Sequence, residues 1–169
     1  MIKVTLSLLL LSWTLSAAAH DGTINIDGSI EEPGCTVSSD SVNQTISLGD
    51  IASSQLSQPG ETSQPIMFKI SFEDCTSVTK TLSLRFNGTS DSTNPDLVAI
   101  DSDPGAASGI AIAIKDSTSS LLPINTNTVA YSLPYSYGSL TYYAQYMATK
   151  DSVTAGTANA TVTFSMTYE

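Results

Sequence analysis

The C-terminal stretch of the chain reads Thr157-Ala-Asn-Ala-Thr-Val-Thr-Phe-Ser-Met-Thr-Tyr-Glu169, and it is the longest clean alternation in the sequence. Small or apolar side chains alternate with polar ones throughout it, which is the period of a β-strand with one buried and one solvated face. The apolar face would consist of Ala158, Ala160, Val162, Phe164, Met166 and Tyr168. Because the alternation runs to the last residue, we expect no following segment to pair with the edge of this strand.

The same period of two recurs along the rest of the chain. The expected strands are Leu140–Met147, Ser108–Lys115, Leu97–Ile100, Thr81–Phe86 and Ile66–Cys75, with extended pieces at Leu121–Ile124, Val129–Leu133, Val42–Leu48 and Thr23–Ile30. No window of about a dozen residues has the period of a helix. Seven or more short strands separated by turn signals predict an all-β sandwich in one domain.

The first nineteen residues, 1–19, are expected to be a secretory signal peptide. Lys3 precedes the apolar run Val4–Leu15, and Ala17 and Ala19 provide a small-x-small cleavage pattern, so His20 is predicted to begin the mature chain. An uncleaved membrane anchor is the alternative. The apolar run is too short for it, because a bilayer-spanning helix needs about 20 such residues.

Cys35 and Cys75 are the two cysteines of the chain. In an exported protein two cysteines are expected to form a disulfide. They lie 40 positions apart without paired histidines, which does not fit a zinc site. Closing a loop of this length would stabilise the domain by about 4 kcal/mol.

The composition excludes several classes of function. Sixteen acidic residues oppose six basic ones, and a net charge of −10 repels nucleic acid and anionic membranes. The one histidine, His20, lies at the predicted mature terminus, so no histidine-based catalytic triad is expected. Asp101, Asp103 and Asp116 lie in polar turns, and their spacing does not match an EF-hand loop. We therefore expect that the protein is not an enzyme, and we assign it no catalytic residue, cofactor or metal.

A cluster of tyrosines offers one candidate binding surface. Tyr142, Tyr143 and Tyr146 could form a sugar-binding platform, but the alternation places Tyr142 and Tyr146 on the core face of their strand.

The two ends of the mature chain have complementary patterns. Thr23–Ile30 alternates as a strand and is separated from Cys35 by the break Glu31-Glu-Pro-Gly34. A strand at one end and an uncovered apolar strand at the other could pair head to tail between copies, and such an interface generates filaments. Thr23–Ile30 could also fold back into its own sheet, and the pattern leaves both arrangements open.

Over its whole mature length the chain resembles pilin subunits assembled by the chaperone–usher route, in particular the minor adaptor subunits of type 1 fimbriae. The motifs that carry the resemblance are, in order, Gly22–Ile30, Pro33–Val37, Phe72–Cys75, Ser108–Ile112, Tyr143–Thr149, Val153–Gly156 and Asn159–Phe164. Gly156 is fourteenth from the C-terminus and Tyr168 is penultimate, and this pair around an alternating strand is specific to these pilins.

The resemblance implies an incomplete immunoglobulin-like β-sandwich in residues 35–169, with six to seven strands and the last strand missing. Residues 20–34 would form an N-terminal donor-strand extension. The missing strand would leave a groove, filled first by a strand of a periplasmic chaperone. After passage to the outer-membrane usher, the extension of a neighbouring pilus subunit would replace the chaperone in donor-strand exchange.

The resemblance also implies which residues form the donor strand and which form the acceptor groove. The donor residues would be Ile24, Ile26, Gly28 and Ile30, and burial of the three isoleucines would contribute on the order of 5–9 kcal/mol. Gly28 would allow a close backbone approach in the groove, and a simple turn is the alternative. The acceptor groove would be formed by Gly156, Ala158, Ala160, Val162, Phe164, Met166, Tyr168 and Glu169. The carboxylate of Glu169 would anchor basic residues of the chaperone.

The function implied is that of a structural subunit of a bacterial fimbria, exported through the periplasm to the cell-surface fimbrium and serving cell adhesion. Residues 20–34 leave no room for an N-terminal lectin domain, which argues against a tip adhesin, and the donor pattern argues against a chain terminator. The Thr-Ile-Asn-Ile start and the Tyr-Met-Ala-Thr motif favour a minor or adaptor subunit that links tip and shaft. The alternatives are a major shaft subunit and a minor adhesin that binds a host glycan. No nucleic-acid binding and no membrane insertion are expected.

Overall fold

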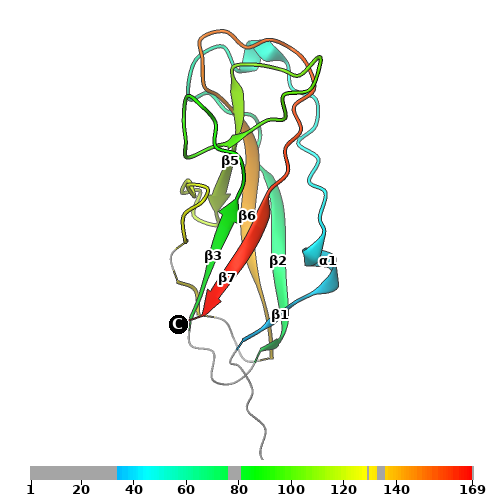
Figure 1. The fold of residues 1–169 in the computed structure, drawn as a ribbon, viewed down its shortest axis with the longest axis vertical. Helices are drawn as coiled ribbons and strands as arrows, with labels where there is room; N and C mark the ends of the chain where they lie inside the picture. The colour runs from blue at the N-terminus through cyan, green and yellow to red at the C-terminus, as the bar shows by residue number, and fades with distance from the viewer. Residues whose placement is uncertain (1–33, 76–80, 129, 133–135, 169) are drawn as a thin grey trace, which may run out of the picture. The chain divides into compact units, whose positions relative to one another are not determined.

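The computed structural model describes residues 34–75, 81–128, 130–132 and 136–168. These residues belong to one compact unit (Figure 1). The predicted signal peptide, the predicted extension apart from Gly34, and Glu169 lie outside the described residues. The elements are β1 (Thr36–Val37), α1 (Ser39–Val42), the 3-10 turn η1 (Ser53–Gln55), β2 (Ile66–Cys75), β3 (Leu82–Asn87), β4 (Val98–Ala99), β5 (Ile110–Asp116), β6 (Ser136–Ala148) and β7 (Thr163–Tyr168).

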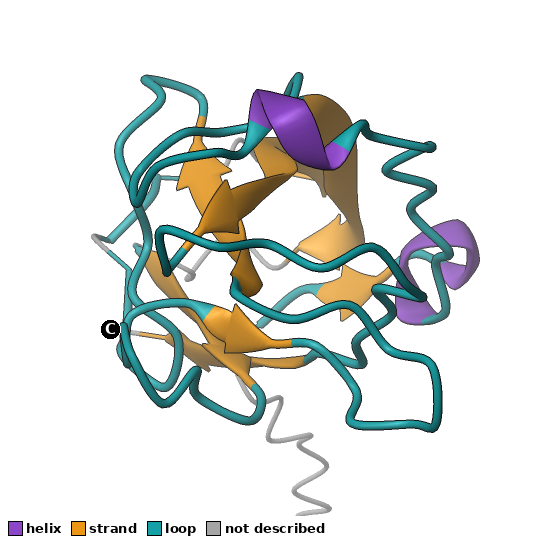
Figure 2. Ribbon diagram, turned by 90° about the horizontal axis from the view of Figure 1, so that it is seen from above, coloured by secondary structure: helices purple, strands orange, loops and turns teal. Residues whose placement is uncertain are grey.

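The strands form two layers, which Figure 2 shows as separate groups of strands with the core between them. One layer is a five-stranded sheet in the order β1-β2-β6-β5-β4, and the other is the pair β3-β7. Every neighbouring pair of these strands is antiparallel. The predicted all-β sandwich is therefore confirmed.

Strand β2 shows how the alternating pattern produces the core. Its bounds, Ile66–Cys75, are those predicted, and it pairs with β6 along nearly its whole length. Every second side chain of β2 points into the sandwich, and Ile70 and Phe72 are almost completely buried. There Phe86 of β3 meets the ring of Tyr142 edge to face, with ring centroids 5.1 Å apart. Such aromatic contacts add stabilisation beyond the buried area.

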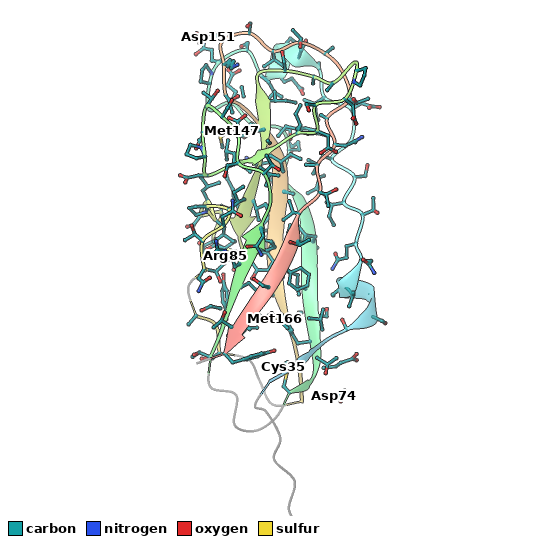
Figure 3. All side chains as sticks on the ribbon, in the orientation of Figure 1. Cys35, Asp74, Arg85, Met147, Asp151 and Met166 are labelled. Atoms are coloured by element: carbon teal, nitrogen blue, oxygen red, sulfur yellow. A yellow bond between two sulfur atoms is a disulfide. The ribbon has the colours of Figure 1, made fainter. Side chains whose placement is uncertain are left out.

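The predicted disulfide between Cys35 and Cys75 is confirmed. It joins the residue before β1 to the last residue of β2. Figure 3 places Cys35 beside the label of Asp74 at one end of the strands. The bond therefore fastens the start of the described chain to the end of β2 in the five-stranded sheet.

Two predicted strands differ from the structure. Val42 ends helix α1 and is 56% exposed, and residues 43–50 form no strand, so the strand expected over Val42–Leu48 is wrong. Strand β7 begins at Thr163, although the strand was expected from Thr157. Its ladder partner β3 ends at Asn87, opposite Thr163, so among the described strands none continues this ladder to the residues before Thr163.

Shorter segments differ in a similar way. Leu97–Ile100 contains only the two-residue strand β4, and Leu121 makes an isolated bridge to Lys115. Within Val129–Leu133, Tyr131 bridges to Leu82, while residues 129 and 133 lie outside the described residues. None of the helices in the described part of the chain is long and apolar enough to cross a membrane.

Candidate functional site

An apolar groove of about 1550 Å³ opens along one side of the sandwich. Its floor is made by side chains of both sheets, which include Phe68, Ile70, Phe86, Ile112 and Ile114. These five side chains belong to, or pack against, the main hydrophobic core. The core of this domain is therefore open to the groove, although apolar cores are normally covered by secondary structure on every side.

The first wall of the groove is the C-terminal alternating segment. Alternate side chains of this segment are partly buried in the groove, namely Ala158, Ala160, Val162, Phe164 and Met166. The residues between them, such as Asn159 and Thr161, also border the groove but are exposed. Strand β7 forms a ladder with β3 along one edge, and no other strand among the described residues pairs with it. The backbone groups of the other edge of β7 are therefore free to pair with an added strand.

The second wall is the irregular segment 42–51. Its side chains Ile46, Leu48 and Ile51 are partly buried, and the segment is tied to β2 by the side-chain amide of Gln44, whose Nε2 donates to the carbonyl oxygen of Lys69 at 2.6 Å. Two extended walls without a strand between them border an apolar floor. This arrangement fits one additional β-strand, whose alternate side chains would face the floor.

One end of the groove is closed by two loops in close backbone contact. Residues 105–108 and 154–157 exchange hydrogen bonds, with the amide of Ala107 donating to the carbonyl of Thr157 at 2.8 Å and that of Thr157 donating to Gly105 at 3.0 Å. Gly156 lies in this contact. The predicted groove residue Gly156 thus fixes the position of the wall where it enters the groove.

We expect Gly156→Ala to lower the stability of the domain by about 1–3 kcal/mol, because an added methyl group must displace close-packed backbone. A Cβ at Gly156 would collide with backbone atoms of Gly105, Ala106 and Ala107. Gly88→Ala is the control, since a Cβ there meets its nearest neighbours at an ordinary 3.6 Å. Thermal unfolding of both variants measures the difference, and equal melting temperatures would contradict this role of Gly156.

Tyr168 marks the other end of the wall. It is not among the residues that line the groove; its ring packs against Gly34 and its hydroxyl contacts Cys35. Of the other predicted site residues, Ile24, Ile26, Gly28, Ile30 and Glu169 lie outside the described residues.

The tyrosine platform considered from the sequence is not formed. Tyr142 is 1% exposed, and Tyr146 is half-buried and donates its hydroxyl hydrogen to the carbonyl of Ala158 at 2.9 Å. Tyr143, which faces away from the core, is also only partly exposed. The three rings therefore offer no common exposed surface.

The carboxylate of Asp116 accepts hydrogen bonds from the turn that follows it. The donors are the amides of Thr118 and Ser120 at 2.8 and 2.9 Å and the hydroxyl of Thr118 at 2.7 Å. Partial desolvation raises the pKa of Asp116, but these hydrogen bonds outweigh it and lower the pKa below its usual value. Asp101 and Asp103 are exposed. Asp116 therefore stabilises a turn.

Sequence reasoning missed the second wall and most of the floor. The inward-facing residues of the predicted strands, such as Phe68 and Ile112, carried a signal, because alternation assigns them to the buried face. Which of them border the gap depends on how the two sheets face each other. The contact between Tyr168 and Cys35 has no signal in local patterns.

The fold and the groove together define a class of protein, an incomplete immunoglobulin-like sandwich that is one strand short. The sequence model described as "Fimbrial protein" matches residues 24–169. The chain therefore belongs to the fimbrial protein family, the pilins of the chaperone–usher route.

Two curated relatives illustrate the match. Long polar fimbria protein A of Salmonella typhimurium is 39% identical over 156 residues, which cover 91% of this chain and 87% of that protein. The probable major fimbrial subunit LpfA of Escherichia coli O157:H7 is 33% identical and covers 100% of this chain and 98% of its own.

Solved structures show the same fold. The Burkholderia pseudomallei antigen and type I fimbria protein BPSL1626 is 31% identical with a TM-score of 0.63, covering 87% of this chain and 97% of its own. The P pilus rod subunit PapA is 24% identical with a TM-score of 0.68, covering 82% of this chain and 100% of its own.

Proposed function

We propose that this protein is a non-enzymatic structural subunit of a fimbria, and that it polymerises by accepting the Thr23–Ile30 segment of a neighbouring copy or related subunit in its groove. The observation that carries the proposal is the apolar groove of about 1550 Å³ between β7 and segment 42–51. An open core beside an unpaired strand edge is unfavourable in an isolated subunit, and a strand from a second molecule covers both.

The donor segment suits this groove in pattern. Ile24, Ile26 and Ile30 recur at even spacing, and so do the wall residues from Ala158 to Met166. Added as a strand, the segment would bury its isoleucines against the floor and form a ladder with the free edge of β7. The groove residues of the neighbour are then Gly156 and the alternate residues of the wall from Ala158 to Met166, while Tyr168 and Glu169 follow the wall.

A periplasmic chaperone is the first occupant in this proposal, because the open core has to be covered before assembly. The outer-membrane usher then brings subunits together, and the fimbrium at the cell surface is the final location. Family membership supports these partners, and the predicted signal peptide, residues 1–19, supports the export route.

The position within the fimbria has two candidates. The motifs near the two ends of the mature chain predict a minor adaptor between tip and shaft. The name of one relative, a probable major fimbrial subunit, favours the shaft. Immunogold labelling of fimbriae separates them, since an adaptor is expected at one end of a fibre and a shaft subunit along its length.

The donor-strand proposal is tested with a synthetic peptide. We expect the peptide Thr23–Ile30 to raise the melting temperature of the purified mature chain by at least about 10 °C, because several kcal/mol of burial correspond to such a shift. A control peptide with asparagine in place of Ile24, Ile26 and Ile30 is expected to have no effect. Equal melting temperatures with the two peptides would reject the proposal.

A further inference from the structure

We propose that Tyr168 is a positioning residue for polymerisation: its hydroxyl fixes the point at which the N-terminal segment leaves the sandwich, so that the segment is presented to the groove of a neighbour. This inference rests on the proposed function. Tyr168 serves the chain in its role as a strand donor, whereas the groove serves it in its role as a strand acceptor.

The first observation is a pair of hydrogen bonds between Tyr168 and one backbone residue. The amide of Cys35 donates to the hydroxyl oxygen of Tyr168 at 2.9 Å, and this hydroxyl donates to the carbonyl oxygen of Cys35, also at 2.9 Å. The two residues are 133 positions apart in the sequence. The hydroxyl also lies 3.8 Å from Sδ of Met166, but its two short bonds use its donor and its acceptor capacity on Cys35 and restrain that backbone in two directions.

The second observation is that Cys35 is attached to both sheets. Its disulfide to Cys75 links it to the end of β2 in the five-stranded sheet, and its hydrogen bonds to Tyr168 link it to the end of β7 in the two-stranded sheet. In Figure 3, Cys35 is labelled at the end of the strands toward which β7 runs from Met166. The backbone at Cys35 is therefore held from both layers.

The third observation is the packing of Gly34, the first described residue. A Cβ built at Gly34 would lie 3.5 Å from the edge of the Tyr168 ring. The ring therefore borders the backbone where the donor segment joins the domain, only four positions after Ile30. Tyr168 does not line the groove itself, whose wall is formed by Met166 and the residues before it.

These contacts separate the two roles of the chain. Loss of the Tyr168 hydroxyl frees the origin of the donor segment, which then samples more orientations and meets a neighbouring groove less often in the productive one. The groove keeps all of its lining side chains. Tyr168→Phe is therefore expected to impair donation and to leave acceptance unchanged.

The experiment uses two full-length mature chains, each limited to one role. The acceptor carries Ile24→Asp and Ile26→Asp, which remove its ability to donate, and the donor carries Ala160→Asp, which blocks its groove. The rate at which the two form a 1:1 complex is followed by native mass spectrometry. Tyr168→Phe is introduced into one chain at a time.

In the donor, Tyr168→Phe is expected to slow complex formation three- to tenfold, with little change in its melting temperature. In the acceptor it is expected to change the rate less than twofold. Tyr142→Phe in the donor is the matched control, because Tyr142 is buried in the core and its hydroxyl makes no hydrogen bond to Cys35. This control is expected to leave the rate unchanged.

An equal effect in both roles, or no effect in the donor, overturns the inference while the proposed function stands. No complex from the parent pair overturns the proposed function itself. If Tyr168→Phe does not fold, amide hydrogen exchange of the wild-type chain decides: protection of the Cys35 amide supports the inference, and exchange as fast as in a free peptide overturns it.

Discussion

Ala160→Asp is expected to abolish binding of the donor segment, with a loss of affinity of at least about 100-fold. Ala160 lies in the wall of the groove and is partly buried against the core. In the unoccupied groove a carboxylate at this position can reach water. Under an added strand it would be buried without a partner, which costs several kcal/mol.

The neighbouring position provides the control for this prediction. Thr161 also borders the groove, but it is exposed, since alternation turns its side chain away from the core. Thr161→Asp adds the same charge one residue along and is expected to change affinity less than about threefold, in line with the small effects of surface substitutions. Titration of both variants with the Thr23–Ile30 peptide measures the contrast. Similar affinities would show that the donor segment does not bind against the groove wall at Ala160.

Cys35→Ser is expected to destabilise the domain by about 4 kcal/mol, the entropy-based value for the loop it opens. For a domain of this size that corresponds to a fall of about 10–15 °C in melting temperature. The disulfide fastens Cys35 to the end of β2, so its loss also loosens the backbone to which Tyr168 bonds. Thermal unfolding by circular dichroism gives the measurement.

The double variant Cys35→Ser/Cys75→Ser and the reduced wild-type chain serve as controls for this prediction. Both are expected to melt at the same temperature as Cys35→Ser, because each lacks the same single bond. A wild-type melting temperature in all three would show that the disulfide does not stabilise the fold.

A strand with one nearly continuous ladder was predictable from the sequence. In β2 the alternation coincides with the observed strand because β6 pairs with it along nearly its whole length, whereas β1 pairs only with Phe72 and Glu73. Where a neighbour is missing, the pattern still predicts burial but no longer predicts a ladder. Ala158, Ala160 and Val162 keep the alternation of buried and exposed side chains although strand β7 starts only at Thr163.

The sequence predicted one wall of the groove but not the other wall or most of the floor. The C-terminal wall follows from a local period, whereas segment 42–51 and the floor are brought together by pairing between distant strands. The hydrogen bonds of Tyr168 to Cys35 span 133 positions and leave no periodic trace. Contacts of this kind depend on how the two ends of the domain meet, and single-sequence patterns describe only neighbours along the chain.

The disulfide has a mechanical consequence for a subunit in a fibre under tension. A pull on the chain ahead of Cys35 passes through the sulfur atoms directly to Cys75, so the chain that joins the two cysteines, with a sequence separation of 40, carries no load. Fully stretched, that stretch would measure about 140 Å. The loop therefore cannot unravel and add its length to a stretched fibre until the disulfide is reduced.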